Sequence, residues 1–336
     1  MKTTDVEVAA TIGFFDGVHR GHQFLVEQLR SEAQKRGLRS VVVTFDRHPR
    51  QVLQPDWHPQ LLTTLAEKVR LLRLTGVDDV VVLHFDMQMA SLSARDFMQQ
   101  VLRRQLGVRL LLTGYDNRFG HRTADSNEGF DDYVAYGQQL GVEVLKALPY
   151  SPLSANSDDI SHATTICSSL IRRLLSEGSV GEAAVCLGRP YALQGTVVHG
   201  QQVGRQMGFP TANLQLQDEC QLVPQNGVYA VWASLDDALG GASPLTPHLS
   251  PLTSHPSPLP AMTNIGLRPT FDGHRLTIET HIFDLDADLY GQALTLHFVE
   301  RLRSEQHFPS PDALAHQMVL DAAAAKTVLN NYLKKE

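Results

Sequence analysis

The first half of the chain alternates short apolar runs with segments whose apolar residues recur at helical spacing. The runs that predict strands are residues 8–12, 40–45, 80–84, 108–113 and 142–148, and the segments that predict helices are 22–35, 64–74, 93–107 and 128–140. Thr64 and Glu67 form a T-x-x-E start signal for the second helix. Single helices between short strands predict βαβ crossovers, and therefore an α/β unit whose parallel sheet is covered on both faces.

After about residue 185 the pattern changes to strands without intervening helices. The strand-like runs are 191–199, 228–235, 276–283 and 293–299, and one amphipathic helix is predicted over 311–333. This pattern predicts an all-β unit, a small barrel with a C-terminal helix. Residues 237–260 are rich in Pro and Ser and predict a long exposed hairpin loop, because they fit neither a strand nor a core.

Length, charge and cysteine content narrow the class of protein. A chain of 336 residues favours two domains. Its net charge of −7 argues against nonspecific binding to nucleic acid or anionic membranes, which requires basic patches. The three cysteines form no CxxC pair, so neither a disulfide framework nor a zinc site is expected. With no apolar run approaching 18 residues and no signal-peptide core, we expect a cytoplasmic protein.

The stretch GFFDGVHRGH, residues 13–22, follows the first predicted strand. Gly17 and Gly21 allow the backbone to approach a ligand closely, and the helix that follows offers free N–H groups and a positive dipole end. His19 and His22 lie near this helix start, where both could face one anion and neutralise charge that develops on a phosphate. A turn with two solvated imidazoles is the simpler alternative. No GKS or GKT follows, so the stretch is not a P-loop.

This stretch resembles the G-x-F-D-G-x-H-x-G-H signature of the HxGH nucleotidyltransferases. A second motif of that superfamily, S-S-T-x-I-R, is resembled by ICSSLIRRLLSEG at 166–178, where Cys167 and Ser169 depart from the pattern. On its own, that segment favours a Ser-capped amphipathic helix, and the phosphate-binding interpretation depends on the HxGH stretch. The resemblance implies a Rossmann-like fold and catalytic roles for His19 and His22. It also implies a set of ATP and phosphate ligands: Gly13, Phe15, Asp16, Gly17, His48, Ser168, Ser169 and Arg172.

Two further segments resemble the FAD synthetase branch of this superfamily, which adenylates FMN. TFDRHPRQVL, residues 44–53, resembles T-F-D-P-H-P, and TGYDNRFGHR, residues 113–122, resembles G-x-D-F-x-F-G. Asp116 and Phe119 match the second motif and are implied to contact the flavin, whereas Asn117 stands where an aromatic residue is commoner.

A second constellation lies at the start of the β-rich half. Gly200, Gly204 and Gly208 could wrap a phosphate with backbone donors, although this spacing often marks only a turn. In the PTAN segment, Thr211 and Asn213 place a hydroxyl and an amide on one face of an extended strand, and their oxygens suit Mg²⁺.

The segment RLTIETHIF, residues 275–283, alternates apolar and polar positions. Thr277, Glu279 and His281 share its polar face. A half-exposed strand explains this alternation, and the sharper interpretation is that Glu279 serves as a general base.

These segments, with NGVYA, NIGLRPTF and RLRSEQHF, resemble bacterial riboflavin kinase. The resemblance implies that Thr211 and Asn213 serve a Mg·ATP site, that Gly200, Gly204, Arg205 and Gly208 bind its phosphates, and that Glu279 is the base for the ribityl 5′-hydroxyl. By pattern, Arg301 falls on the flavin side.

Together the two resemblances identify the chain as similar to the bifunctional riboflavin kinase/FMN adenylyltransferases. They imply an adenylyltransferase domain over 1–178, a linker at 179–187 and a kinase domain over 188–336. The expected small molecules are riboflavin, FMN, FAD and ATP with Mg²⁺, and the sequence leaves self-association open. Two alternatives remain: a chain in which only the kinase works, because Cys167 and Asn117 weaken the first site, and a non-catalytic flavin-binding protein.

Overall fold

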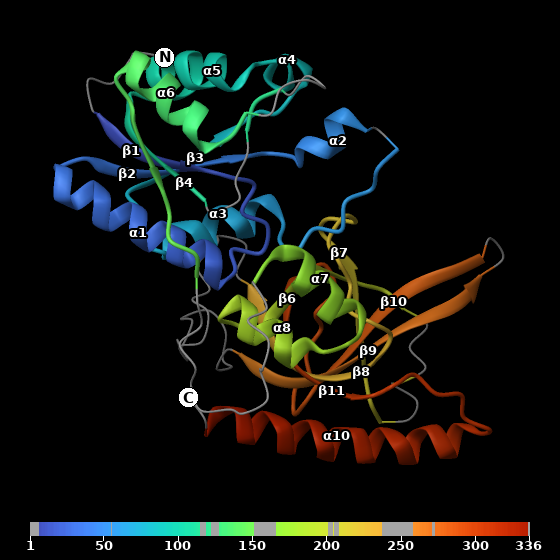
Figure 1. Ribbon diagram of the computed structural model, residues 1–336. Helices are drawn as coiled ribbons and strands as arrows, with labels where there is room; N and C mark the ends of the chain where they lie inside the picture. Colours follow the sequence, from blue (N-terminus) through green and yellow to red (C-terminus); the bar gives the residue numbers. More distant parts are fainter. Residues whose placement is uncertain are drawn as a thin grey trace. The chain divides into compact units, whose positions relative to one another are not determined.

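The computed structural model describes residues 7–54, 56–114, 119–121, 128–150, 166–200, 204, 208–236, 258–270 and 273–334. The chain divides into two compact units, Met1–Ser168 and Ser169–Glu336 (Figure 1). The first unit is the predicted α/β unit and the second is the predicted β-rich unit. None of the helices in the described ranges is both long and apolar enough to cross a membrane.

The first unit contains a five-stranded parallel sheet in the order β3-β2-β1-β4-β5. Its strands are β1 (Val8–Ile12), β2 (Arg39–Phe45), β3 (Asp79–Leu83), β4 (Val108–Thr113) and β5 (Glu143–Lys146). All four pairings are parallel, as the alternation of strands and helices predicted. Since β1 lies between β2 and β4, the direction of winding reverses at β1, and ligands of such sheets bind beyond the strand ends at this switch point.

Helices cover both faces of this sheet. They are α1 (Arg20–Arg36), α2 (Pro49–Leu53), α3 (Leu65–Leu74), α4 (Met87–Ala90), α5 (Ala94–Phe97), the π-helix η1 (Met98–Gln105) and α6 (Phe130–Leu140). One core cluster joins α1 and α3 to the sheet, and a second joins α5, η1 and α6 to its other face. The helix predicted over 93–107 is therefore α5 continued by η1, with Ser93 accepting a hydrogen bond from the Asp96 N–H at its start.

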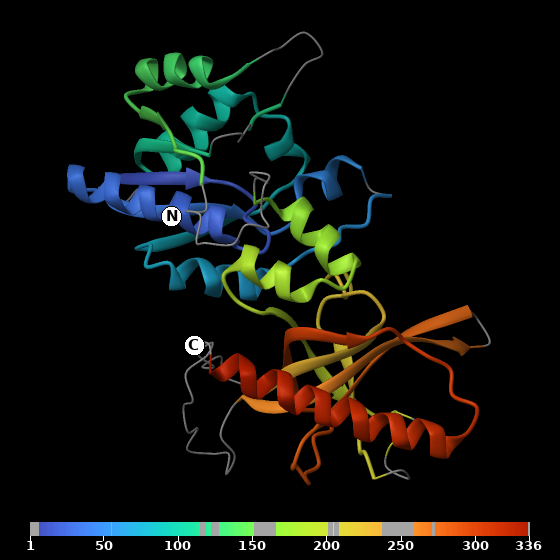
Figure 2. The same ribbon diagram turned by 60° about the horizontal axis from the view of Figure 1, so that its bottom comes forward.

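The second unit begins with two helices and contains a closed antiparallel barrel in the order β10-β7-β6-β11-β8-β9. Its elements are α7 (Ser168–Ser176), α8 (Val180–Leu187), β6 (Tyr191–Val198), β7 (Ala212–Leu216), β8 (Gly227–Asp236), β9 (Leu259–Thr270), β10 (Gly273–Ile282), β11 (Ala293–Arg303) and α10 (Pro311–Leu333). The segment predicted as a linker is helix α8, which packs on β6 and β11. Helix α10 lies along the outside of the barrel, where Ala325 and Leu329 meet Trp232 and Met262 (Figure 2).

One barrel strand, β9, was not predicted, and β7 was predicted only as the extended PTAN segment that carries Thr211 and Asn213. The pattern of β9 is interrupted by Pro260 and Pro269 near its ends, positions that weaken a strand signal. Strands β8 and β9 pair in antiparallel register from Gly227↔Ile265 to Ala233↔Leu259 and flank the predicted Pro/Ser-rich hairpin loop. Residues 237–257 of that loop lie outside the described residues.

Candidate active sites

The turn after β1 holds the first candidate site. Three of its residues have left-handed backbone: Phe15 with φ 55°, Gly17 with φ 80° and Val18 with φ 40°. Only glycine adopts this conformation without strain, so the turn must be held by contacts elsewhere. One of these is the bond from the Gly13 N–H to the Val43 carbonyl, 3.1 Å, which fixes the exit from β1 beside β2.

Asp16 anchors this turn from within. Its buried carboxylate accepts hydrogen bonds from the N–H groups of Leu62, 2.9 Å, and Thr63, 3.3 Å. The Gly17 N–H donates to the Thr63 hydroxyl, 3.2 Å, and the Ser168 hydroxyl donates to the Asp16 carbonyl, 3.0 Å. The sequence predicted Asp16 and Ser168 as phosphate ligands, and the contacts that the structure shows for them are those that hold the turn.

The two predicted catalytic histidines lie against each other. Their rings stack with centroids 3.6 Å apart and an angle of 18° between planes. His19 caps α1, and its Nδ1 accepts a hydrogen bond from the His22 N–H, 3.3 Å, so any proton on a neutral His19 ring belongs to Nε2. At Gly21 a Cβ atom would lie 3.2 Å from that Nδ1, so glycine gives the imidazole room.

Burial, and then the nearby charges of His19 and Lys68, hold the pKa of His22 well below its ordinary value. His22 is therefore neutral at pH 7. Its Nδ1 is buried and has no hydrogen-bond partner among the described residues, which leaves a polar atom available at this turn. A neutral imidazole can donate one hydrogen bond to an incoming phosphate oxygen.

The turn after β2 brings His48 to the same site. His48 caps α2 through its own Nδ1, which accepts from the Arg50 N–H, 3.1 Å, and its ring meets the Phe14 ring edge-on at 4.8 Å. Lys68, which sequence reasoning missed, lies beneath Phe14 with its ammonium 3.9 Å from the ring centroid. The available signal was a lysine on the apolar face of a predicted helix, since Lys68 is buried together with Leu71 and Leu72.

The other predicted residues of the first site belong to two segments, helix α7 and residues 113–122. Ser169, which is exposed, and Arg172, which is half-buried, both lie on α7 in the second unit. Asp116, together with Asn117, lies outside the described residues. Phe119 stacks on Tyr133 with ring centroids 4.4 Å apart and exchanges backbone hydrogen bonds with its hydroxyl, so its described contacts are with the core of the unit.

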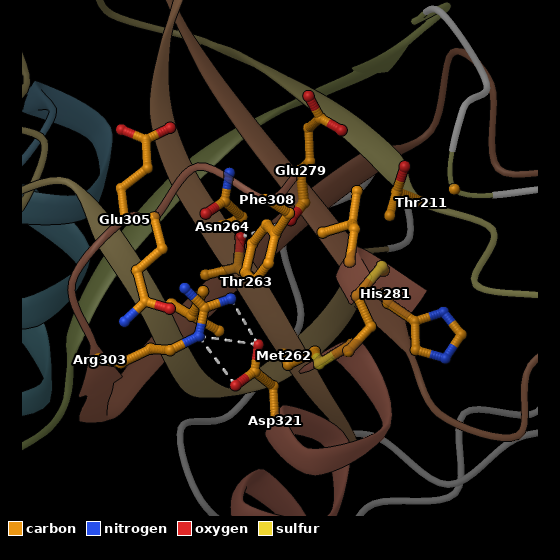
Figure 3. A pocket seen from close by; sticks show the side chains of 15 residues that line it. Thr211, Met262, Thr263, Asn264, Glu279, His281, Arg303, Glu305, Phe308 and Asp321 are labelled. Carbon is orange, nitrogen blue, oxygen red and sulfur yellow. Dashed lines mark hydrogen bonds and ion pairs between the residues drawn. The ribbon is translucent and has the colours of Figure 1, made fainter. Parts of the chain in front are cut away.

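The second candidate site is a cavity of about 230 Å³ in the second unit. Strands β9, β10 and β11, the chain after β11 and helix α10 supply its walls. Figure 3 shows Glu279 and Thr211 on one side of it, Arg303 and Asp321 on the other, and the Phe308 ring between them. Met262, Leu314 and Met318 add apolar surface, so the cavity combines a flat aromatic and aliphatic wall with polar groups at its ends.

Strand register places Glu279 in a row of polar residues. It pairs with Asn213 of β7 on one side and with Asn264 of β9 on the other. The alternate residues Ile278 and Thr280 are buried inside the barrel, which confirms the predicted alternation of β10. His281, two residues on, binds the Pro210 carbonyl through Nδ1, 2.8 Å, and so holds the PTAN segment beside β10.

Close packing explains two of the three glycines before the PTAN segment. A Cβ on Gly200 would lie 2.2 Å from the Asn213 amide nitrogen, and one on Gly204 would lie 2.3 Å from the Phe209 carbonyl oxygen. Gly208 has φ 81°, a conformation that favours glycine. Arg205, predicted beside them, lies outside the described residues.

The far side of the cavity is built on an ion pair that the sequence did not indicate. The Arg303 guanidinium donates three hydrogen bonds to the Asp321 carboxylate, from Nε to Oδ1 at 2.9 Å and to Oδ2 at 3.0 Å, and from Nη2 to Oδ2 at 2.7 Å. Gln317 donates to the same carboxylate, 2.9 Å. Arg301, predicted on the flavin side, is not among the residues that line this cavity. Its guanidinium donates to the Asn226 carbonyl, and its side chain lies against Gly178 and Gly227.

Comparison with known proteins agrees with this division into two sites. The protein-family model described as FAD synthetase matches residues 1–163 of the chain, and the family model described as riboflavin kinase matches residues 187–329. A bifunctional riboflavin kinase/FMN adenylyltransferase of Escherichia coli is 36% identical over 94% of this chain and 91% of its own length. One of Pseudomonas fluorescens is also 36% identical, over 95% and 92%. A solved structure from Streptococcus pneumoniae, described as a macrolide-efflux protein, is similar with a TM-score of 0.79, 30% identity and coverage of 96% and 95%.

Proposed function

This chain belongs to the family of bifunctional riboflavin kinase/FMN adenylyltransferases, and from that premise we propose which of its residues perform each reaction. The enzyme phosphorylates riboflavin to FMN with ATP and then transfers the adenylyl group of a second ATP to FMN, which gives FAD and pyrophosphate. The proposal assigns the first reaction to the cavity beside Glu279 and the second to the turn that holds His19 and His22.

In the kinase reaction Glu279 is the general base. Its carboxylate takes the proton of the ribityl 5′-hydroxyl as that oxygen bonds to the γ-phosphorus of ATP, and the bond from that phosphorus to ADP breaks. The observation that supports this role is its place in the cavity wall with Thr211, in register with Asn213 and Asn264. The apolar wall formed by Phe308 and its neighbours suits a flat isoalloxazine ring.

The residues around Glu279 also suit the Mg²⁺ that accompanies ATP. Thr211 and Asn213 offer a hydroxyl and an amide oxygen, which are hard ligands of the kind that Mg²⁺ accepts beside phosphate oxygens and waters. A Cβ at position 200 would overlap the Asn213 amide, so the glycine leaves room for that group. Bound there, the ion would neutralise charge on the transferred phosphoryl group.

In the adenylyl transfer a phosphate oxygen of FMN attacks the α-phosphorus of ATP, and pyrophosphate leaves. His19 and His22 lie at the start of α1, a helix of 17 residues whose N-terminus favours an anion. We assign to their ring N–H groups the stabilisation of charge on the α-phosphate, and to His48, Ser168, Ser169 and Arg172 contacts with the triphosphate. Asp116 and Phe119 are the proposed flavin contacts of this reaction.

Two variants test the separation of the sites. The protein is incubated with riboflavin, ATP and Mg²⁺, and the flavins are separated over time by chromatography. Glu279→Gln should lower FMN formation by about 10²–10⁴-fold, the usual contribution of a general base, and leave FAD formation from supplied FMN unchanged. His22→Ala should do the reverse.

Three results of the same assay would contradict the proposal. If either variant stops both reactions while the protein remains folded, the assignment of separate sites is wrong. If His22→Ala leaves FAD formation intact, the histidine turn does not perform the transfer. If the unmodified protein accumulates FMN without FAD, only the kinase is active, and Cys167 and Asn117 become the positions to restore.

A further inference from the structure

Lys68 is a buried cation in the first unit that neither motif predicts. Lys68 is 2% exposed. Its ammonium donates a hydrogen bond to the Phe45 carbonyl, 2.9 Å, and lies 3.9 Å from the centroid of the Phe14 ring. Among the described residues no carboxylate lies within ion-pair distance of this ammonium. Burial lowers the pKa of Lys68 to about 8, while the charges of Asp16 and Asp46 oppose that shift. A buried ammonium held in this way costs free energy of folding, so stability alone does not explain it.

The two contacts of Lys68 belong to two different turns of the candidate site. Phe45 is the last residue of β2 and leads into the turn that carries His48. Phe14 belongs to the turn after β1 that carries His19, and its ring also meets the His48 ring at 4.8 Å. One ammonium therefore contacts residues of both segments, and the Phe14 ring contacts both this ammonium and the His48 ring.

The beginning of the same helix holds the β1 turn at a second point. Leu62 and Thr63, just before α3, donate their N–H groups to the Asp16 carboxylate, and the Thr63 hydroxyl accepts from the Gly17 N–H. Lys68 follows one turn later, with its own N–H bonded to the Thr64 carbonyl, 2.9 Å. The segment 62–68 thus contacts the turn after β1 at two places: Leu62 and Thr63 bond to Asp16 and Gly17, and Lys68 contacts Phe14.

We propose that Lys68 is a positioning residue for adenylyl transfer: its ammonium joins the turns after β1 and β2 and so sets the placement of His19, His22 and His48 relative to one another. The proposal rests on the roles assigned above to the two histidines of the β1 turn. Lys68 acts through Phe14 and the Phe45 carbonyl, and touches no substrate.

The test uses the full chain with Lys68→Met, which keeps the length and apolar stem of the side chain and removes the charge. Steady-state kinetics of FAD formation from FMN and ATP should show kcat lowered at least about tenfold, with the KM of ATP changed less than about threefold. Lys68→Arg restores a cation that can bond a carbonyl and stack on an aromatic ring, and should recover most of the rate. Thermal unfolding of Lys68→Met should show no loss of stability, because a buried charge has been replaced by an apolar group.

Two controls accompany these variants. Arg70→Met changes a cation on the same helix that is paired with Glu67 at 2.7 Å and partly exposed, and should leave the adenylyl transfer rate within about twofold. Riboflavin phosphorylation, measured on each variant, should be unchanged.

The outcomes separate the proposal from its alternatives. Unchanged kcat in Lys68→Met overturns it. Equal loss of stability and rate, or a Lys68→Arg variant no faster than Lys68→Met, shows that the residue only packs the unit and also overturns it. His22→Ala measured alongside distinguishes the underlying assumption: if that variant keeps full adenylyl transfer, the proposed roles of the histidines fail rather than the role of Lys68.

Discussion

The ion pair between Arg303 and Asp321 allows a quantitative test of how α10 is held on the barrel. Asp321 is on α10 and Arg303 ends β11, and their side chains are 6% and 17% exposed. Asp321→Asn keeps the shape of the side chain and removes its charge, so the guanidinium remains largely buried without a counter-charge. Removing one partner of a buried pair costs about 3–5 kcal/mol, and we expect the lower end, about 3 kcal/mol, because asparagine retains one acceptor for Arg303.

The matched control is a surface ion pair of the same helix. Asp284 is 86% exposed and lies 3.6 Å from Lys326 of α10. Asp284→Asn should change the free energy of unfolding by less than about 1 kcal/mol, as is usual for exposed pairs. Asparagine is chosen because Asp284 has φ 58°, a conformation that asparagine tolerates better than alanine does.

The measurement uses the chain's two tryptophans, one in each unit. Trp232 packs in the core between the barrel and α10, so in a Trp57→Phe background its fluorescence reports unfolding of the second unit. A loss of about 3 kcal/mol corresponds to a melting point lowered by roughly 6–12 °C for a unit of this size. FAD formation from supplied FMN, assayed below the transition, should be unaffected. If Asp321→Asn costs no more than Asp284→Asn, the ion pair does not hold α10 and the argument is refuted.

Two other predictions follow from local geometry and charge. Gly200→Ala should raise the KM of ATP in the kinase reaction at least about tenfold, because its Cβ would overlap the Asn213 amide. Gly181→Ala is the control and should leave this KM unchanged, because the nearest atom to its Cβ would lie 3.7 Å away. Equal KM values for the two variants would show that the room beside Asn213 is unimportant. Burial lowers the pKa of Lys68 to about 8 from an ordinary 10.5. Between these two pH values the unfolded chain keeps the lysine proton, whereas the folded chain has released it. The free energy of unfolding should therefore increase as the pH rises from 8 to 10.5. Urea denaturation across this interval should show that increase in the unmodified protein and not in Lys68→Met, and parallel curves would contradict the cause given for the shift.

Local sequence signals determined much of this protein. Apolar periodicity located the five strands of the first unit and most of its helices, because each of these elements buries a face that repeats at its own period. The start signal at Thr64 was equally direct, because its hydroxyl accepts a hydrogen bond from the Glu67 N–H, and α10 begins at Pro311 as predicted. The glycine–histidine stretch pointed to the end of β1 because its residues are contiguous.

Tertiary structure alone decided which distant residues complete each site. Strand β9, with prolines near both ends, is a strand because the barrel closes through it, and the row that places Asn264 beside Glu279 exists only in that register. The pairing of Arg303 with Asp321 likewise requires α10 to fold back over the barrel. Lys68 has an ordinary place in a helical pattern, and its burial between two turns follows from the packing of α3 against strands far away in the sequence. Periodicity records which side of an element is buried, whereas the partners on that side are chosen by long-range register and packing.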